Sequence, residues 1–376
     1  MPLTVVIAGG GTGGHLYPGI AVAREVLARD PGARVSFAGT SRGLEARVVP
    51  QEGFELDVIR SAGLKGKSIV ARLRGVAMLV PGLIDAWRLL ARRAPDVVIG
   101  VGGYSSGPVV LLAALRRVPT LVLEQNAAPG LTNRLLARVV RAAAVSWPDT
   151  LPYFRGKGFV AGNPVRREFF EAGERPAGTP AAGEAGAPVT RAGGAPRVLV
   201  IGGSQGAHVI NVAMAGAAGT LARRVPAPVV VHQAGARDLD LVQDAYAAAA
   251  LPSRVAPFLD PVAPEMAAAD LVVCRAGATT LAELAAAGRP AVLVPYAAAT
   301  DDHQRRNARV LVDGGAAEMV EERELDAATL AARIDALLAD PARRTAMGAA
   351  MRTFARPDAA ARIVDRVMAL AGRVGA

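Results

Sequence analysis

The sequence predicts an α/β protein built from two tandem Rossmann-like domains with parallel sheets. Two segments share one pattern, in which an apolar strand runs into a glycine-rich turn and then into a helix, at residues 4–28 and again from residue 197. Apolar strands that alternate with helices are typical of parallel sheets covered on both faces. A length of 376 residues with 52% hydrophobic and 20% charged residues suits two folded domains.

The first half of the chain supplies the elements of one domain in order. The strand that opens it leads into a glycine turn at 9–14 and a helix-like run at 20–28. This succession is the opening of a Rossmann-like unit. Apolar strands are expected, in order, at residues 4–8, 34–38, 96–100 and 119–124.

The second half repeats this order. Its glycine turn at 202–206 follows one strand and precedes a helix-like run from Val209. Strands are expected at residues 197–201, 270–274 and 290–295. We therefore expect an N-terminal domain at 1–164 and a C-terminal domain at 165–356. Two further segments complete the division, a flexible insertion at about 171–196 and a helix at about 357–376 that is a candidate to pack on the first domain.

Cysteine usage and hydropathy exclude several classes of protein. A single cysteine, Cys274, excludes a disulfide scaffold and a cysteine-rich zinc site. The N-terminus has no basic region before its apolar run, so no signal peptide is expected. The longest uncharged run, 97–115, is interrupted by glycine and proline, so no membrane-spanning segment is expected.

The positive charge is confined to one half of the chain. Residues 1–165 carry 20 Lys and Arg against 10 Asp and Glu, whereas residues 166–376 carry 23 of each. Such an asymmetry indicates a polyanionic partner, either nucleic acid, an anionic membrane surface or a phosphorylated substrate. A basic and apolar segment at 61–90, which includes Trp87, fits a helix that lies on an anionic membrane and equally an ordinary amphipathic helix with a solvated face. The charge asymmetry favours the membrane.

The first glycine turn matches the pattern of a phosphate-binding turn. A dinucleotide site would also need an acidic residue at the end of the second strand, and this strand ends in residues 39–42 without one. Arg42 at that place keeps NADP binding open as an alternative. His15 follows the turn directly, at the strand edge where ligands of open sheets bind, and is a candidate general base.

Polar residues follow other strands of the same predicted sheet. Because the carboxyl ends of parallel strands meet at one edge, we expect these residues to converge there. They are Gly103, Tyr104, Glu124, Asn126 and Asn133.

The second half offers a corresponding set of polar groups. The turn that contains Ser204 is an anion cradle, and the helix that begins near Ala278 presents Thr279 and Thr280 at its N-terminus. Glu283 lies one turn inside that helix, where a carboxylate can accept bonds from ribose hydroxyls. The adjacent acids at 301–302 suggest a metal, but no third ligand with suitable spacing is visible.

These motifs together resemble the MurG family of peptidoglycan N-acetylglucosaminyltransferases. The resemblance implies a GT-B fold with a cleft between the two domains, and no catalytic metal or cofactor. It implies inverting transfer of N-acetylglucosamine from UDP-N-acetylglucosamine to the 4-hydroxyl of lipid I, a lipid-linked muramyl pentapeptide, which gives lipid II. The matching motifs lie at residues 9–15, 102–104, 124–126, 162–166, 202–206, 277–283 and 303–304.

The resemblance also assigns roles to individual residues. His15 and Glu124 are implied as catalytic, and the residues themselves do not decide which is the base. Acceptor contacts are implied for Gly103, Tyr104 and Asn133. Donor contacts are implied for Thr12, Gly13, Gly14, Asn126, Arg166, Ser204, Leu259, Ala278, Thr279, Thr280, Leu281, Ala282, Glu283 and Gln304. It further implies a peripheral protein on the cytoplasmic face of the inner membrane, with anionic inner-leaflet lipids and cell-wall synthesis or division proteins as partners.

Three other functions are weighed against this one. An NADP-dependent oxidoreductase would use the first glycine turn but would leave the second turn and Glu283 without a role. A sugar-nucleotide epimerase on the same scaffold would share the donor half but would need no basic membrane face. A nucleic-acid-binding protein would be expected to carry stacking aromatics, and aromatic residues make up only 4% of the chain.

Overall fold

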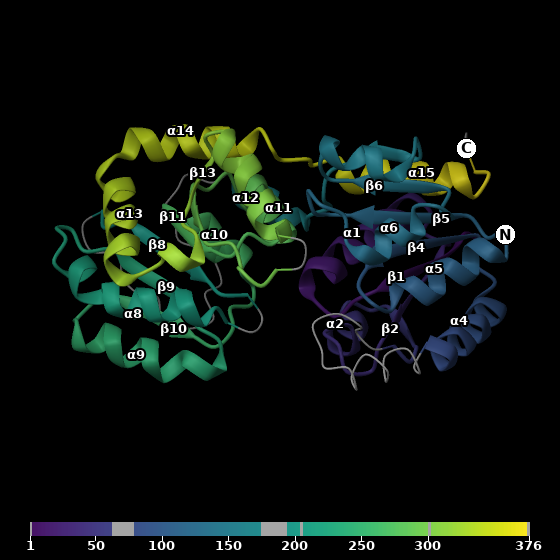
Figure 1. Cartoon of the computed structure of the whole chain (residues 1–376), viewed down its shortest axis with the longest axis horizontal. Helices are drawn as coiled ribbons and strands as arrows, with labels where there is room; N and C mark the ends of the chain where they lie inside the picture. The colour runs from purple at the N-terminus through teal and green to yellow at the C-terminus, as the bar shows by residue number, and fades with distance from the viewer. Residues whose placement is uncertain (1, 62–78, 174–193, 204–205, 300–301, 374–376) are drawn as a thin grey trace. The chain divides into compact units, whose positions relative to one another are not determined.

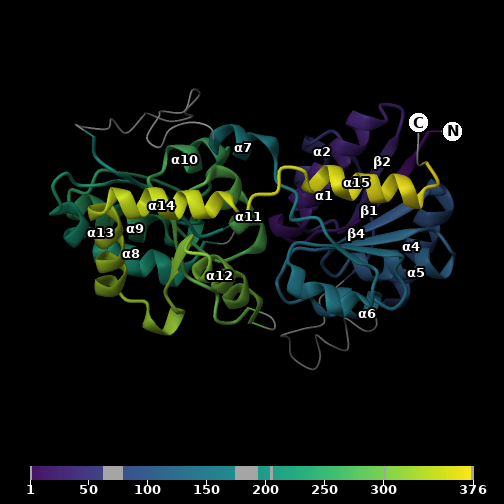
Figure 2. The same cartoon turned by 90° about the horizontal axis from the view of Figure 1, so that it is seen from above.

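The computed structural model describes residues 2–61, 79–173, 194–203, 206–299 and 302–373. They form two compact units, each with its own parallel sheet. Unit 1 comprises Met1–Arg166 and Arg356–Ala376, and unit 2 comprises Arg167–Ala355. Figure 1 labels many of the elements of each unit, and Figure 2 adds α7.

Unit 1 contains a seven-stranded sheet with the order β3-β2-β1-β4-β5-β6-β7. Every described pair of neighbouring strands is parallel. Alternate residues of the central strand β1 point to opposite faces, so Val5 and Ile7 join one apolar core and Val6 and Ala8 the other. The strands are β1 (Thr4–Gly9), β2 (Arg34–Gly39), β3 (Glu55–Val58), β4 (Val97–Gly102), β5 (Thr120–Glu124), β6 (Ala142–Val145) and β7 (Gly158–Val160).

Two sets of helices cover this sheet. One face carries α1 (Gly13–Arg29), α2 (Glu45–Gln51) and α15 (Ala359–Leu370), whose buried side chains form a single cluster with Val5 and Ile7. The other face carries α4 (Leu79–Arg93), α5 (Ser106–Leu115) and α6 (Leu131–Leu136). A 3₁₀ helix, η1 (Pro148–Phe154), follows β6.

The C-terminal helix returns to unit 1 after the chain has completed unit 2. Helix α15 packs beside α1, as Figure 2 shows, and buries Ile363, Val364 and Val367. An ion pair between Arg29 and Asp365 joins the two helices. The last helix is therefore part of the core of the first unit.

Unit 2 repeats the architecture with a six-stranded parallel sheet of order β10-β9-β8-β11-β12-β13. The strands are β8 (Arg197–Ile201), β9 (Val229–Gln233), β10 (Ser253–Ala256), β11 (Leu271–Cys274), β12 (Ala291–Leu293) and β13 (Ala317–Met319).

The helices of unit 2 again lie on both sides of its sheet. Helices α8 (His208–Ala222), α9 (Leu239–Ala248), α13 (Ala327–Ala339) and α14 (Pro341–Arg352) contribute buried side chains to one large cluster. Helix α7 (Arg167–Gly173) packs against α10 (Ala263–Ala268) and α11 (Ala278–Ala287). The remaining elements are α12 (His303–Asp313), η2 (Ala236–Asp238) and η4 (Glu322–Glu324).

In both units the first strand ends in a glycine turn, and the polar residues named from the sequence follow the carboxyl ends of the strands. Each set therefore lies at the edge of a parallel sheet where ligands of open α/β folds bind.

Candidate active site

The first glycine turn joins β1 to α1 and needs backbone conformations that favour glycine. Gly9, Gly10 and Gly11 all have positive φ, and a Cβ atom at Gly9 would fall against the backbone of Gly102. Thr12 precedes the first turn of α1, and its Oγ1 lies 3.1 Å from Nδ1 of the half-buried His15. The turn thus brings the histidine and a hydroxyl group together at the sheet edge.

A second glycine turn, after β4, packs directly on the first. A Cβ atom at Gly102 would meet the imidazole ring of His15, and one at Gly103 would lie 2.6 Å from the carbonyl oxygen of Gly10. Tyr104, the next residue, is 52% exposed. Glycine at these places lets the two turns touch and sets His15 against the end of β4.

Glu124 closes β5 as a buried carboxylate surrounded by nitrogen donors. Its Oε1 accepts hydrogen bonds from the N–H of Asn126 at 3.0 Å and from Asn126 Nδ2 at 3.2 Å. Its Oε2 accepts from the N–H of Gly130 at 3.0 Å and from Asn133 Nδ2 at 2.9 Å. Burial raises the pKa of Glu124, and these donors act against that shift. The carboxylate therefore shapes the loop that carries Asn126 and ties it to the buried Asn133 of helix α6.

Arg166 lies in unit 1, at the end of the segment 162–166. Its guanidinium stands over the ring of Tyr17, 4.5 Å from the centroid. Tyr17 in turn lies against Gly13 in the first turn of α1. The arginine is thus held close to the helix N-terminus that follows the first glycine turn.

Glu45 is a site residue that the sequence analysis missed. It begins α2, is 1% exposed, and its Oε2 accepts a hydrogen bond from the N–H of Gly11 at 2.7 Å. A dinucleotide site would have an acid at the end of β2, and this chain has none there. Glu45, six residues further along, reaches the turn instead. The nearby glycines at 39 and 43, which leave room for the Glu45 side chain, were the feature of the sequence that could have pointed to it.

Gln233 is a second missed residue, and it lies at the end of β9 in unit 2. Its Nε2 donates to the carbonyl oxygen of Gly203 at 2.7 Å, and its Oε1 accepts from the N–H of Leu259 at 3.2 Å. One partner only accepts and the other only donates, so the orientation of the amide is fixed. Gln233, 3% exposed, therefore ties the glycine turn after β8 to the loop of Leu259, which is itself 6% exposed.

Helix α11 begins at Ala278, directly after Gly277, and places the expected donor residues in its first two turns. Thr279 is 8% exposed and Leu281 only 1%, so Leu281 is part of the core. Ala278, Thr280, Ala282 and Glu283 are half-buried. Gln304 lies on α12, which packs against α11, and its Oε1 accepts from the N–H of Tyr296 at 2.9 Å.

Hydrogen bonds from Arg275 hold the loop that follows β12 in place. Arg275 donates to the carbonyl oxygens of Val294 and Pro295 at 3.2 and 3.3 Å, and to Glu322 Oε1 at 3.0 Å. Glu322 Oε2 accepts from the N–H of Ala297 at 2.6 Å. The loop that positions Gln304 is therefore fixed by groups from two other segments, which periodicity alone does not reveal.

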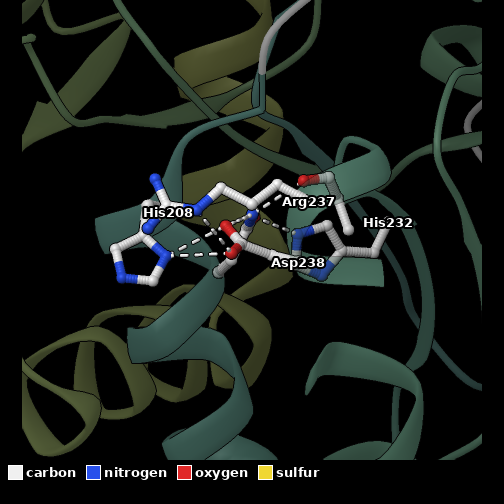
Figure 3. A network of polar contacts seen from close by, with 6 residues as sticks. His208, His232, Arg237 and Asp238 are labelled. Carbon is white, nitrogen blue, oxygen red and sulfur yellow. Dashed lines mark hydrogen bonds and ion pairs between the residues drawn. The ribbon is translucent and has the colours of Figure 1, made fainter. Parts of the chain in front are cut away.

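A polar network lies next to the glycine turn that follows β8 in unit 2 (Figure 3). The exposed His208, first residue of α8, places its Nδ1 3.0 Å from both carboxylate oxygens of Asp238. Asn211 donates to Asp238 Oδ2 at 2.9 Å and to the carbonyl oxygen of Ala234 at 2.8 Å. Gly206 packs on the carbonyl of Ala234, so the network fixes the backbone against which the glycine turn after β8 lies.

The network ends on two buried rings. His232 Nε2 lies 3.0 Å from Asn211 Oδ1, and His232 Nδ1 lies 2.8 Å from the hydroxyl of Tyr246. Burial lowers the pKa of His232 to about 3 and raises that of Tyr246. Both rings are therefore neutral at physiological pH and support the fold of this edge of the sheet.

Some expected residues lie outside the described part of the chain. Ser204 is one of them, as are Asp301 and most of the basic and apolar segment 61–90. Within the described ranges, no three His, Cys, Asp or Glu side chains gather so that they could hold a metal ion. Asp302, the described member of the acidic pair, is exposed and lies 3.7 Å from Arg305.

Comparison with known protein families gives a match in each unit. Residues 5–145 match the glycosyltransferase family 28 N-terminal domain, and residues 197–363 match the glycosyltransferase family 28 C-terminal domain.

Full-length relatives agree with these matches. A UDP-N-acetylglucosamine--N-acetylmuramyl-(pentapeptide) pyrophosphoryl-undecaprenol N-acetylglucosamine transferase of Anaeromyxobacter dehalogenans (strain 2CP-C) is 48% identical, over 99% of this chain and 94% of its own length. A protein of the same name from Geobacter sulfurreducens is 44% identical, over 98% of both chains.

Solved structures resemble the chain over its whole length. Acinetobacter baumannii MurG has a TM-score of 0.76 at 30% identity, covering 98% of this chain and all of its own. A UDP-GlcNAc 2-epimerase from Neisseria meningitidis, with a TM-score of 0.67 at 13% identity over 98% of this chain and all of its own, shows the same fold only. The two parallel-sheet units are thus the two domains of a GT-B glycosyltransferase, and the chain belongs to glycosyltransferase family 28.

Proposed function

We propose that the chain transfers N-acetylglucosamine from UDP-N-acetylglucosamine to the 4-hydroxyl of lipid I and so makes lipid II for peptidoglycan. The observation that carries this proposal is the 48% identity, over nearly the whole chain, with a relative of that name. The glycine turn after β1 in unit 1 and the glycine turn after β8 in unit 2 each lie at a sheet edge with polar groups around them, where ligands of open α/β folds bind.

Unit 2 would bind the nucleotide. Leu259 would back the uracil, Glu283 would accept the ribose hydroxyls, and the turn after β8 with the N-terminus of α11 would hold the diphosphate. Helix N-termini attract phosphate because their first N–H groups have no partner within the helix. The hydrogen bonds of Gln233 to Gly203 and Leu259 support this role, since one side chain fixes two of the expected contacts.

Unit 1 would bind the acceptor and the sugar end of the donor. Thr12, Gly13, Gly14 and Asn126 would face the donor sugar. Tyr104 and its neighbour Gly103 would contact the acceptor, whereas the buried Asn133 would support that site through its bond to Glu124.

His15 is our candidate for the general base. The contact to Thr12 fits an Nδ1–H that donates to the hydroxyl, and this tautomer leaves the lone pair on Nε2. The base would take the proton of the acceptor 4-hydroxyl as its oxygen attacks C1 of N-acetylglucosamine from the face opposite UDP. The bond from C1 to the β-phosphate oxygen would break, and its electron pair would leave with UDP. Glu124 suits this step less well, because four N–H groups already surround its carboxylate.

The outer surface of α4 and α5 would lie on the membrane that carries lipid I. Its large exposed side chains are Val80, Ile84, Trp87, Leu111 and Leu115. The guanidinium of Arg116 stands over the Trp87 ring at 4.6 Å, and Arg88, Arg92 and Arg117 are exposed nearby in the same two helices and the turn after them. An apolar surface edged with arginine suits the cytoplasmic leaflet and its anionic lipids. No helix among the described residues is long and apolar enough to cross a bilayer.

The test is transfer of labelled N-acetylglucosamine from its UDP donor to a short-chain lipid I analogue, with EDTA present. We expect a labelled disaccharide lipid. Turnover of the UDP sugar without an acceptor would instead indicate an epimerase, and a product formed only after addition of magnesium would refute the metal-free mechanism.

A further inference from the structure

The buried carboxylate of Glu45 holds the glycine turn after β1 through a hydrogen bond to its backbone. Glu45 Oε2 accepts the N–H of Gly11 at 2.7 Å, and its Oε1 accepts the N–H and the hydroxyl of Thr40 at 2.9 and 2.8 Å. Burial raises the pKa of Glu45, but the hydrogen bonds from Gly11 and Thr40 outweigh it, and the net shift is downward. The group is therefore an anion held inside unit 1.

The space around this carboxylate is built from bare backbone. A Cβ atom at Gly10, Gly39 or Gly43 would approach the Glu45 side chain closer than real Cβ atoms approach their neighbours. These glycines come from three places, namely the turn itself, the end of β2 and the loop before α2. Glycine at all three lets the carboxylate reach the turn without displacing its backbone.

The turn that Glu45 holds leads directly to the groups expected to act on substrate. Gly11 is followed by Thr12, whose hydroxyl contacts His15. The carbonyl of Gly10 also forms the surface on which Gly103 packs. A shift of the peptide between Gly10 and Gly11 would therefore move both the threonine and the turn after β4.

We propose that Glu45 is the positioning residue of the acceptor-side turn, which it fixes through the N–H of Gly11 so that Thr12 and His15 keep their orientation. The proposal rests on the function proposed above for these two residues. The same carboxylate occupies the Gly11 N–H, a group that dinucleotide-binding turns direct at a pyrophosphate. In this structure the Gly11 N–H is already occupied by a side chain of the same unit.

The experiment is Glu45→Gln in the full chain. Glutamine has nearly the same shape, and with its oxygen towards Thr40 its NH₂ group would oppose the N–H of Gly11. We expect kcat to fall roughly 10–100-fold, the range for one hydrogen bond to a charged group. The Kd for UDP should stay unchanged, because Gly11 is not part of unit 2.

Two further variants make the result specific. Glu52→Gln changes a carboxylate that ends the same helix and pairs with Arg24 at the surface, and it should behave as the wild type. Thr40→Val removes the hydroxyl that donates to Glu45 and accepts from the N–H of Gly43, while the Thr40 N–H bond to Glu45 and the Gly11 bond remain, so it should give a smaller loss of kcat in the same direction.

Measuring the folded fraction of each variant by its melting curve separates positioning from stability. An unchanged kcat in Glu45→Gln, or a loss matched by the loss of folded protein, would overturn the proposal. Equal losses in Glu45→Gln and Glu52→Gln would overturn it as well. Absence of transfer by the wild type would instead refute the proposed function, and intact UDP binding would show that unit 2 is still correctly assigned.

Discussion

Lowering the pH should destabilise unit 2 through the single residue His232. Its imidazole is completely buried between Asn211 and Tyr246 at the end of β9. Asn211 uses its Nδ2 for Ala234 and Asp238, so its Oδ1 must accept from His232 Nε2–H, and His232 Nδ1 accepts from the Tyr246 hydroxyl. A second proton, on Nδ1, would displace the hydroxyl hydrogen of Tyr246 from its acceptor and would place a charge in a buried apolar site.

The size of the effect follows from the pKa of His232, which burial lowers from 6.5 to about 3. In the unfolded chain the ring binds a proton as the pH falls below 6.5, whereas in the folded chain it stays neutral until about pH 3. The stabilisation is therefore complete above pH 6.5 and is lost as the pH falls. By pH 5 the loss is about 2 kcal/mol, and the slope approaches ~1.4 kcal/mol per pH unit.

The assay is urea-dependent hydrogen exchange of peptides from β8 and β9, between pH 7.5 and pH 5, corrected for the intrinsic rate. His232→Gln can donate to Asn211 and accept from Tyr246 without titrating, so its opening free energy should lose most of this slope. His208→Gln, at an exposed position, is the matched control and should retain it. Asp238, whose pKa is lowered, loses its contribution only at more acidic pH, below its ordinary value of 3.8. Equal slopes in the wild type and in His232→Gln would refute the reasoning.

Three other perturbations give separate tests. Gln233→Met leaves the carbonyl of Gly203 and the N–H of Leu259 without their partner, so the KM for UDP-N-acetylglucosamine should rise roughly tenfold; steady-state kinetics would contradict this if only the acceptor KM changed. Trp87→Ala removes an exposed ring from the surface of α4 and α5, so sedimentation with phosphatidylglycerol vesicles should weaken about 10–100-fold, and unchanged binding would remove this surface from the membrane model. Glu124→Gln replaces one of two acceptor oxygens with a donor, so kcat and Tm should both fall, and an unchanged Tm would show that the four hydrogen bonds of Glu124 contribute little.

The fold was predictable because its signals are local. Continuous apolar strands and glycine turns mark a parallel sheet wherever they occur, and the structure has β1, β4, β8 and β11 within two residues of the expected ranges. Glycine at positions such as 9 and 102 reflects backbone conformations and close approaches that larger residues do not fit, so the sequence itself displays them.

The supporting residues were not predictable in the same way. Glu45 reaches Gly11 across 34 positions, and Gln233 reaches Leu259 across 26, so only the three-dimensional fold brings them together. The dinucleotide pattern looks for an acid at the end of the second strand and therefore passes over Glu45. A glutamine at the end of an apolar strand was a weak signal for Gln233, because such a residue can equally face water.

The return of α15 to unit 1 has a consequence for synthesis on the ribosome. Ile363, Val364 and Val367 complete the core around α1, yet they are translated only after the roughly 190 residues of unit 2. At roughly 5–20 residues per second the first unit would wait roughly 10–40 s for its last helix. During that interval the side of α1 that α15 covers is open to solvent, so the nascent N-terminal half has an incomplete core.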